Sequence, residues 1–148
     1  MTHEDYMNQA LTLAREAAAH GEVPVGCVIV RDGKIIGRGR NRREEKQAVS
    51  SHAEMEAMAQ ANEALGSWRL EDCDLYVTLE PCPMCAGAIL NARVRRVFYG
   101  ARDRAMGACG GVLNQFMEDF PHHPQQVGGI LAEDCQTVLS AFFKELRK

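Results

Sequence analysis

Two short segments, His52-Ala-Glu54 and Pro81-Cys-Pro-Met-Cys85, constrain the fold of this chain more than any other feature. Together they supply one imidazole and two thiols. A catalytic zinc site has three protein ligands and leaves its fourth position to water. An apolar run typical of a strand, Leu75–Leu79, lies between the two segments. The fold must therefore carry the chain across a strand and still bring His52 close to the two cysteines.

The residues around each segment predict the start of a helix. If Cys82 and Cys85 open a helix, free backbone N–H groups and the positive end of the helix dipole favour their thiolates. Their i, i+3 spacing places both sulfurs on one face. Ser51 is expected to cap a second helix that runs to about Ala64, with Glu54 completing a capping box. Two helix starts would then meet over one metal ion.

Glu54 separates a catalytic site from a merely structural one. Two residues after His52, its carboxylate would lie beside a metal-activated water without being a ligand, and it could move protons as a general acid and base. The alternative is a closed structural zinc site with Cys73 or Cys109 as a fourth ligand. Glu54 has no purpose in that alternative. Cys27 and Cys135 fall at apolar positions and are interpreted as small core residues.

The remaining pattern predicts an α/β fold. Helical periodicity covers residues 3–20 and 133–146, and Asp32-Gly33 predicts a hairpin turn. The stretch 41–50 is polar and is expected to be an irregular loop. Together with the helices at 51–64 and 82–91, this order implies a three-layer sandwich, a central mixed sheet of about five strands with helices on both faces. The expected strands cover residues 25–30, 34–39, 75–79, 94–100 and 130–131.

Size and charge limit the classes of function. The 148 residues suit one domain, 1–148, and a formal net charge of -3 gives no overall basic field. Nucleic-acid binding would therefore depend on local basic groups, which occur at 38–46, 93–96 and 144–148 and are expected around one mouth. No run approaches a membrane span, and the polar start does not resemble a signal peptide. We expect a cytoplasmic protein whose close cysteine pair binds metal.

The two segments match the H-x-E and P-C-x-x-C pattern of zinc-dependent nucleobase deaminases. Over almost its full length the chain resembles bacterial tRNA-specific adenosine deaminases. The matching stretches include Glu22–Gly26, Gly39–Asn41, Leu75–Ile89, Gly100–Asp103 and Gly129–Cys135. The C-terminal third is particular to the tRNA-acting branch, although Ala105, Pro121 and Gln125 depart from its usual residues.

This resemblance implies a homodimer that converts the wobble adenosine of a tRNA anticodon loop to inosine. It implies one Zn²⁺ per chain, held by His52, Cys82 and Cys85, with Glu54 as the catalytic residue. By the same resemblance, Asn41 hydrogen-bonds the purine. The other substrate-binding residues it implies are Val25, Ala53, Arg102 and Asp103.

Two other functions remain open from the sequence. A deaminase of free guanine, cytosine or a cytidine nucleotide would use the same zinc site and differ in its pocket and C-terminal segment. A non-catalytic partner subunit would keep the zinc and lose activity, but such a subunit has no need of the Glu54 carboxylate.

Overall fold

A computed structural model describes residues 1–147, and it is built on one five-stranded sheet in the order β2-β1-β3-β4-β5. β1 pairs antiparallel with both β2 and β3, whereas β3, β4 and β5 run parallel. The sheet is therefore mixed. The strands are β1 Gly26–Arg31, β2 Lys34–Arg40, β3 Cys73–Leu79, β4 Arg96–Ala101 and β5 Gln125–Val127.

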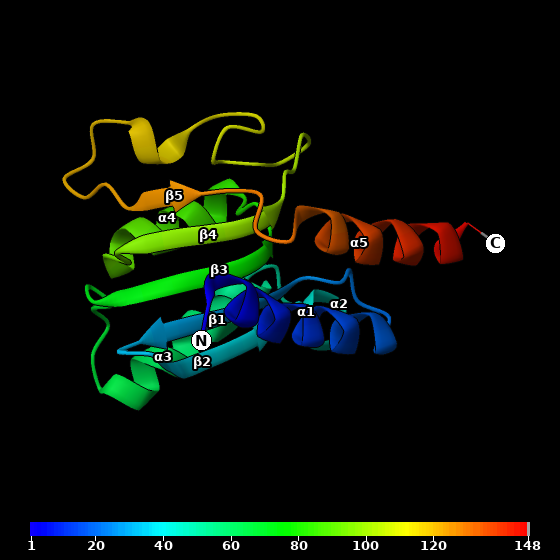
Figure 1. Ribbon diagram of the computed structural model, residues 1–148, viewed down its shortest axis with the longest axis horizontal. Helices are drawn as coiled ribbons and strands as arrows, with labels where there is room; N and C mark the ends of the chain where they lie inside the picture. Colours follow the sequence, from blue (N-terminus) through cyan, green and yellow to red (C-terminus); the bar gives the residue numbers. More distant parts are fainter. Residues whose placement is uncertain (148) are drawn as a thin grey trace.

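Helices cover both faces of the sheet and give the expected three layers (Figure 1). α1 and α5 pack on one face, where their apolar side chains meet Val28, Tyr76 and Phe98. α3 and α4 pack on the other face against Ile29 and Val77. The helices are α1 His3–Ala19, α2 Arg43–Lys46, α3 Ala53–Leu65, α4 Pro83–Ala92 and α5 Ala132–Leu146, with a 3₁₀ turn at Gln115–Met117.

The predicted fold class is confirmed, but three local expectations were wrong. Ser51 does not cap α3: His52 is the N-cap residue and no side chain caps the helix. The stretch 41–50 contains the short helix α2 rather than only loop. The fifth strand lies at Gln125–Val127 instead of 130–131.

The misplaced fifth strand has a simple cause. Within the sheet β5 pairs only with β4, and its two glutamines are not fully buried, so this edge strand needs no apolar alternation. Ile130 lies just beyond it, and its N–H still donates to the Tyr99 carbonyl oxygen. Backbone pairing with β4, which sequence periodicity does not report, decides where the strand forms.

Gly39 sets how closely α3 approaches the sheet. A Cβ atom at this position would overlap the Ala53 carbonyl oxygen and the Ala57 backbone nitrogen. Because glycine has no side chain, the first turn of α3 lies directly against β2. This contact fixes the position of His52 and Glu54 at the start of the helix.

Within residues 1–147, no helix has both the length and the apolar character needed to span a bilayer.

Candidate metal centre and nucleobase pocket

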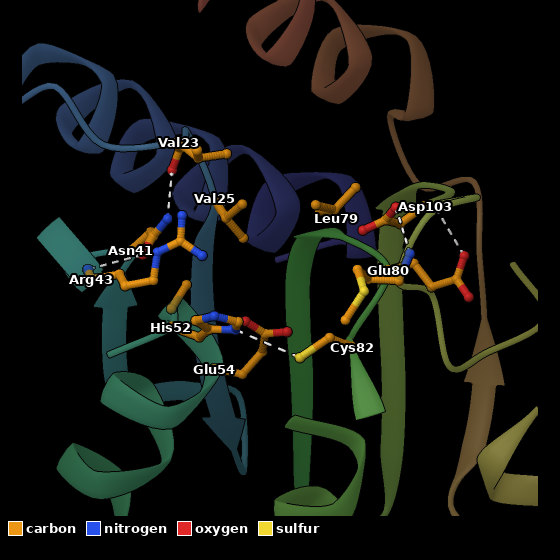
Figure 2. A pocket seen from close by; sticks show the side chains of 12 residues that line it. Val23, Val25, Asn41, Arg43, His52, Glu54, Leu79, Glu80, Cys82 and Asp103 are labelled. Atoms are coloured by element: carbon orange, nitrogen blue, oxygen red, sulfur yellow. Dashed lines mark hydrogen bonds between the residues drawn. The ribbon is translucent and has the colours of Figure 1, made fainter. Parts of the chain in front are cut away.

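The starts of α3 and α4 meet at the carboxyl end of β3, as the two sequence segments predict. His52 is the N-cap residue of α3 and Cys82 is the N-cap residue of α4. Pro83 occupies the first turn of α4, where its missing N–H is not needed. Cys85 follows one turn later and is buried. Two helix termini therefore place one imidazole and two thiols together. Figure 2 shows two of these side chains, His52 and Cys82, facing one another.

The geometry of these three side chains fits a tetrahedral metal ion. His52 Nδ1 lies 3.6 Å from Cys82 Sγ and 3.5 Å from Cys85 Sγ. All three candidate ligand atoms lie within 4.8 Å of one another. A tetrahedral zinc ion with ligand bonds of about 2.0–2.3 Å separates its ligands by roughly 3.5 Å. One nitrogen and two sulfur donors are also a set that zinc favours.

The local contacts favour deprotonation of one thiol. Hydrogen bonds with Cys85 and His52, together with the Cys85 backbone N–H, lower the pKa of Cys82 to about 4 against an opposing effect of burial. The hydrogen bond to Cys82 and then burial raise the pKa of the Cys85 thiol. The hydrogen bond to Cys82 also raises the pKa of His52. The three groups form one donor set at the helix termini.

The alternative of a closed site with a fourth cysteine gains no support. Among residues 1–147, the group able to hold an ion contains His52, Cys82 and Cys85 alone. Cys73 begins β3, and Cys109 lies in the segment after β4. Burial is the main factor that raises the pKa of each of these two thiols, to about 11 and about 12 respectively. Both are protonated core residues at neutral pH.

Glu54 lies beside this donor set in the first turn of α3. It is only 4% exposed, and burial raises the pKa of its carboxyl group to about 7. Hydrogen bonds from its own backbone N–H and from the Cys85 thiol oppose that shift. A carboxyl group that is half protonated near neutral pH is suited to accept and to donate protons.

A cavity of about 210 Å³ opens above these groups and is mostly apolar. It collects residues from five parts of the chain: the segment before β1, the segment after β2, the start of α3, the end of β3 with the residues that follow it, and the segment after β4 (Figure 2). Four of the expected substrate-binding residues line it: Val25, Asn41, Ala53 and Asp103. The cavity is also lined by residues that no sequence pattern had indicated individually: Val23, Arg43, Leu79, Glu80 and Met106.

Asn41 is oriented by the backbone around it. Its Nδ2 donates to the Val23 carbonyl oxygen at 3.3 Å, and its Oδ1 accepts from the Arg43 N–H at 3.1 Å. The side chain is therefore fixed at the cavity wall rather than turned to solvent.

Arg102, the fifth of the expected substrate-binding residues, lies beside the cavity rather than in its wall. It does not line the cavity; its Nη2 donates to Tyr99 Oη at 2.8 Å, and its Nη1 lies 3.6 Å from the Glu80 carboxylate. It faces an adjoining hollow of about 620 Å³, which Arg104 and Arg147 also line.

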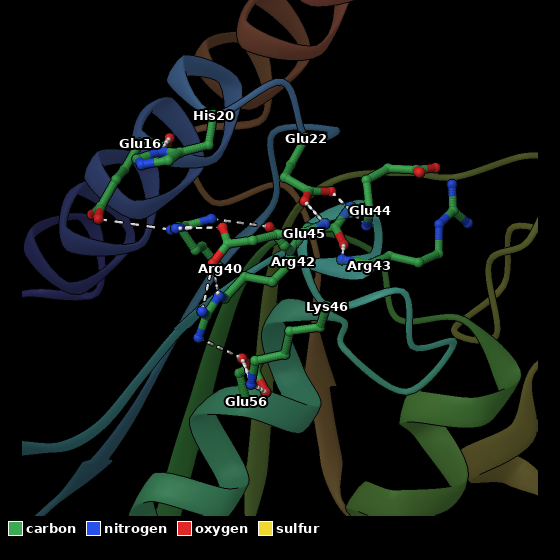
Figure 3. Close-up of polar contacts among 11 residues, drawn as sticks. Glu16, His20, Glu22, Arg40, Arg42, Arg43, Glu44, Glu45, Lys46 and Glu56 are labelled. Carbon is green, nitrogen blue, oxygen red and sulfur yellow. Dashed lines mark hydrogen bonds and ion pairs between the residues drawn. The ribbon is translucent and has the colours of Figure 1, made fainter.

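The three groups of basic residues are not equally available for nucleic-acid binding. Arg40, Arg42 and Lys46 form ion pairs with Glu16, Glu45 and Glu56, as Figure 3 shows. Arg95 and Arg96 bind Asp74 at the opposite end of β3 and β4 from the cavity, so the group at 93–96 does not surround the mouth as expected. Lys148 lies outside the described residues.

The family comparisons agree with this geometry. The model of the MafB19-like deaminase family matches residues 1–147. A tRNA-specific adenosine deaminase of Bacillus subtilis is 49% identical, covering 100% of this chain and 93% of that protein. A similar enzyme of Streptococcus pyogenes is 44% identical, covering 97% of this chain and 91% of that one.

Solved structures give the same fold. One from a study of A-to-I editing by tRNA:A34 deaminases at the wobble position is 44% identical, with a TM-score of 0.88 over 91% of this chain and 99% of that chain. A guanine deaminase from Bacillus subtilis is 39% identical, with a TM-score of 0.67 over 86% of this chain and 83% of that one. With the fold and the zinc-type donor set in place, the chain belongs to the MafB19-like deaminase family and, within it, to the tRNA-specific adenosine deaminases.

Proposed function

We propose that this deaminase hydrolyses the wobble adenosine of a tRNA anticodon loop to inosine, with release of ammonia. The observation that carries the proposal is the buried Glu54 carboxyl group beside the His52, Cys82 and Cys85 donor set. These groups form the floor of a cavity that can admit one nucleobase. Full-length identity of 44–49% to tRNA-specific adenosine deaminases supports the choice of substrate.

In this proposal His52, Cys82 and Cys85 hold one zinc ion per chain. When bound, zinc supplies Lewis acidity that makes water a competent nucleophile at neutral pH. The two cysteines and the histidine reach this position without distorting either helix, because they occupy helix termini.

Glu54 carries the protons. Hydrolysis of an amino group on a purine moves two protons of the attacking water: one passes to the ring nitrogen as water adds to the ring carbon, and the second passes from the resulting hydroxyl to the amine, which leaves as ammonia. The Glu54 carboxyl group is buried beside the donor set, where it can take each proton from the attacking water and pass it to the purine. The apolar walls around it limit access of bulk water to the reacting atoms.

The cavity residues orient the base. Asn41, held by Val23 and Arg43, presents a fixed amide to the purine, while Val25 and Ala53 pack against the ring. Asp103 lies at the side of the cavity that adjoins the second hollow, and Arg102 lines that hollow, which supports contacts of both with the nucleotide's sugar and backbone.

Flanking nucleotides are expected to occupy the adjoining hollow. Arg102, Arg104 and Arg147 line it and share it with Phe143, which is 40% exposed. Guanidinium groups for phosphates beside an aromatic ring for base stacking are the usual means of binding single-stranded RNA. A loop base is already partly unstacked, so moving it into the cavity costs less than extracting it from a duplex.

We further propose that residues 1–148 act as one deaminase domain in a cytoplasmic homodimer. The six cysteines are all free, which suits a reducing compartment. Between α3 and α4 the surface has an apolar hollow lined by Met55, Met58, Trp68 and Ala88, and Trp68 is 53% exposed. Apolar surface of this kind is suited to contact with a second copy. Analytical ultracentrifugation of the parent and of Trp68→Glu tests the assignment, which predicts a dimer that the substitution weakens.

The decisive test of the function is substrate choice. Purified protein should form inosine in an anticodon stem-loop that carries adenosine at the wobble position, and should act far more weakly on free adenine, guanine and cytosine. Its rate on RNA should fall with salt, by about 0.7 log units per log unit for each phosphate contact. The competing function is that of the guanine deaminase it resembles. Salt-insensitive deamination of guanine with an inert stem-loop would assign the chain to that branch.

A further inference from the structure

Glu80 is a buried acidic residue at the cavity that the proposed reaction does not use. It stands between the end of β3 and the cysteine segment, and its side chain has 0% exposure. It lines the cavity wall on the side opposite Asn41 (Figure 2). A carboxylate buried at such a place needs compensating donors.

Arg102 forms an ion pair with Glu80 at 3.6 Å, and the hydrogen-bond donors come from a single backbone segment, residues 103–111. Glu80 Oε1 accepts from the Asp103 N–H at 3.0 Å, and Oε2 accepts from the Cys109 and Gly111 N–H groups at 2.8 Å each. Backbone N–H groups that converge on one point form a site for an anion. Here the bound anion is the chain's own Glu80.

The segment is shaped to fit this carboxylate closely. A Cβ atom at Gly107 would overlap the Glu80 carboxylate, and one at Gly111 would crowd it and overlap the Asp103 carbonyl oxygen. Glycine at both positions permits the approach. A fourth backbone bond, from the Ala108 N–H to the Pro81 carbonyl oxygen at 2.8 Å, fastens the same segment to the cysteine segment.

The held segment is itself part of the cavity wall. Asp103 and Met106 line the cavity together with His52, Glu54 and Cys82. The Asp103 carboxylate is turned back to accept from the N–H groups of Ala105 and Met106, which makes the wall a fixed turn. Glu80 therefore links the side of the cavity that carries Cys82 to the wall that meets the substrate.

We propose that Glu80 is a positioning residue: by holding segment 103–111 it sets the cavity wall formed by Asp103 and Met106, and so controls substrate binding rather than chemistry. The inference rests on the proposed function for its substrate, but its structural part stands on the hydrogen bonds alone. It predicts a separation between KM and kcat that a general loss of stability would not produce.

The test is Glu80→Gln. The amide keeps the size of the carboxyl group but points an NH₂ group at backbone donors, so one or two of the three hydrogen bonds are lost. Hydrogen exchange at the amides of Asp103, Cys109 and Gly111 should accelerate on the order of tenfold, as for one lost hydrogen bond to a charged group. KM for the anticodon stem-loop should rise by a similar factor, while kcat and metal content stay within about threefold.

Asp74→Asn is the matched control. Asp74 is also a buried carboxylate, but it lies near the start of β3, at the opposite end of the strand from Glu80, and binds Arg95 and Arg96. This variant should lower thermal stability while leaving KM and exchange in segment 103–111 unchanged. If Glu80→Gln is too unstable to purify, Gly107→Ala displaces the same segment without removing the carboxylate and should raise KM likewise.

Three results would overturn the inference: unchanged exchange at Cys109 and Gly111 in Glu80→Gln, a fall in kcat with KM unaltered, or loss of metal. A parent protein that forms no inosine would refute the proposed function instead. The exchange measurement would still decide whether Glu80 holds the segment, because it needs no substrate.

Discussion

Two glutamates at one cavity have opposite surroundings. Glu54 is buried beside the His52, Cys82 and Cys85 group, its donors are its own N–H and a thiol, and burial raises its pKa to about 7. Glu80 is equally buried but accepts three backbone N–H groups from segment 103–111. Burial alone therefore does not identify a proton-transfer residue. The contacts distinguish the two: Glu54 lies at the metal-type donor set, and Glu80 holds a backbone segment.

The largest effect is expected when one ligand of the metal site beside Glu54 is removed. Cys82→Ser should lose bound metal and, with it, all measurable deamination, because one of three ligands is gone. Elemental analysis of the purified variant measures the loss directly. Cys73→Ser and Cys109→Ser are the controls and should keep one metal ion per chain, since neither belongs to the donor group. Metal loss in either control would favour a closed structural site.

A smaller difference in activity is expected between substitutions of two neighbouring arginines on the Asn41 side of the cavity. Arg42 is paired with Glu45 and Glu56, whereas Arg43 lines the cavity and, within residues 1–147, has no ion-pair partner (Figure 3). An unpaired cation there is available to a substrate phosphate. Arg43→Ala should lower kcat/KM on the stem-loop roughly three- to tenfold and reduce the salt slope by about 0.7.

Arg42→Ala removes the same charge from the adjacent position and serves as the control. It should change the salt slope much less, because its guanidinium is already occupied by two carboxylates. Equal slopes for the two variants would show that only the overall field matters, and Arg43 would then lose its assigned contact.

The smallest effect concerns the far end of the sheet. Burial opposes ionisation of Asp74, but hydrogen bonds from Arg96 and Arg95 outweigh it and lower its pKa. The ionised form therefore stabilises the folded protein above about pH 4, the pKa of an unfolded aspartate, and this contribution is lost as pH falls through the lower folded value. Asp74→Asn should cost about 1 kcal/mol at pH 7 because both arginines are partly exposed.

Denaturant titrations of the parent and Asp74→Asn at several pH values measure this contribution. The two curves should converge toward pH 3. A difference that stayed constant down to that pH would mean that the lost stability has another source than the ion pair.

Much of the site was accessible from the sequence because its residues lie in short local patterns. His52, Glu54, Cys82 and Cys85 each belong to a segment whose spacing already specifies a helix start, and the structure brings them together as expected. Ser51 misled because a serine before a glutamate also fits a capping box, whereas burial commits Glu54 to the cavity. The local sequence patterns identified the site residues, but they did not show in which direction each side chain points.

The roles of Glu80 and of the ion pairs could not be predicted in this way, because they depend on contacts between segments that are distant in sequence. The partners of Glu80 lie 23 to 31 residues away, and they are backbone groups that leave no mark on the sequence. Only the glycines at 107 and 111 could have hinted at a close approach. Likewise, the charge run at 38–46 appears uniformly available until the structure shows that Glu56, ten residues beyond Lys46, neutralises part of it.

The most direct test of the account is a single-turnover measurement on the wobble-adenosine stem-loop with metal-loaded Glu54→Gln. The substitution keeps the size of the side chain and removes the proton-transfer group, so we expect full metal content and a rate at least 100-fold below the parent, within the range of general acid–base catalysis. Glu80→Gln, measured beside it at saturating enzyme, should stay near the parent rate. Turnover by Glu54→Gln within tenfold of the parent would contradict the assignment of Glu54 and the contrast drawn between the two glutamates.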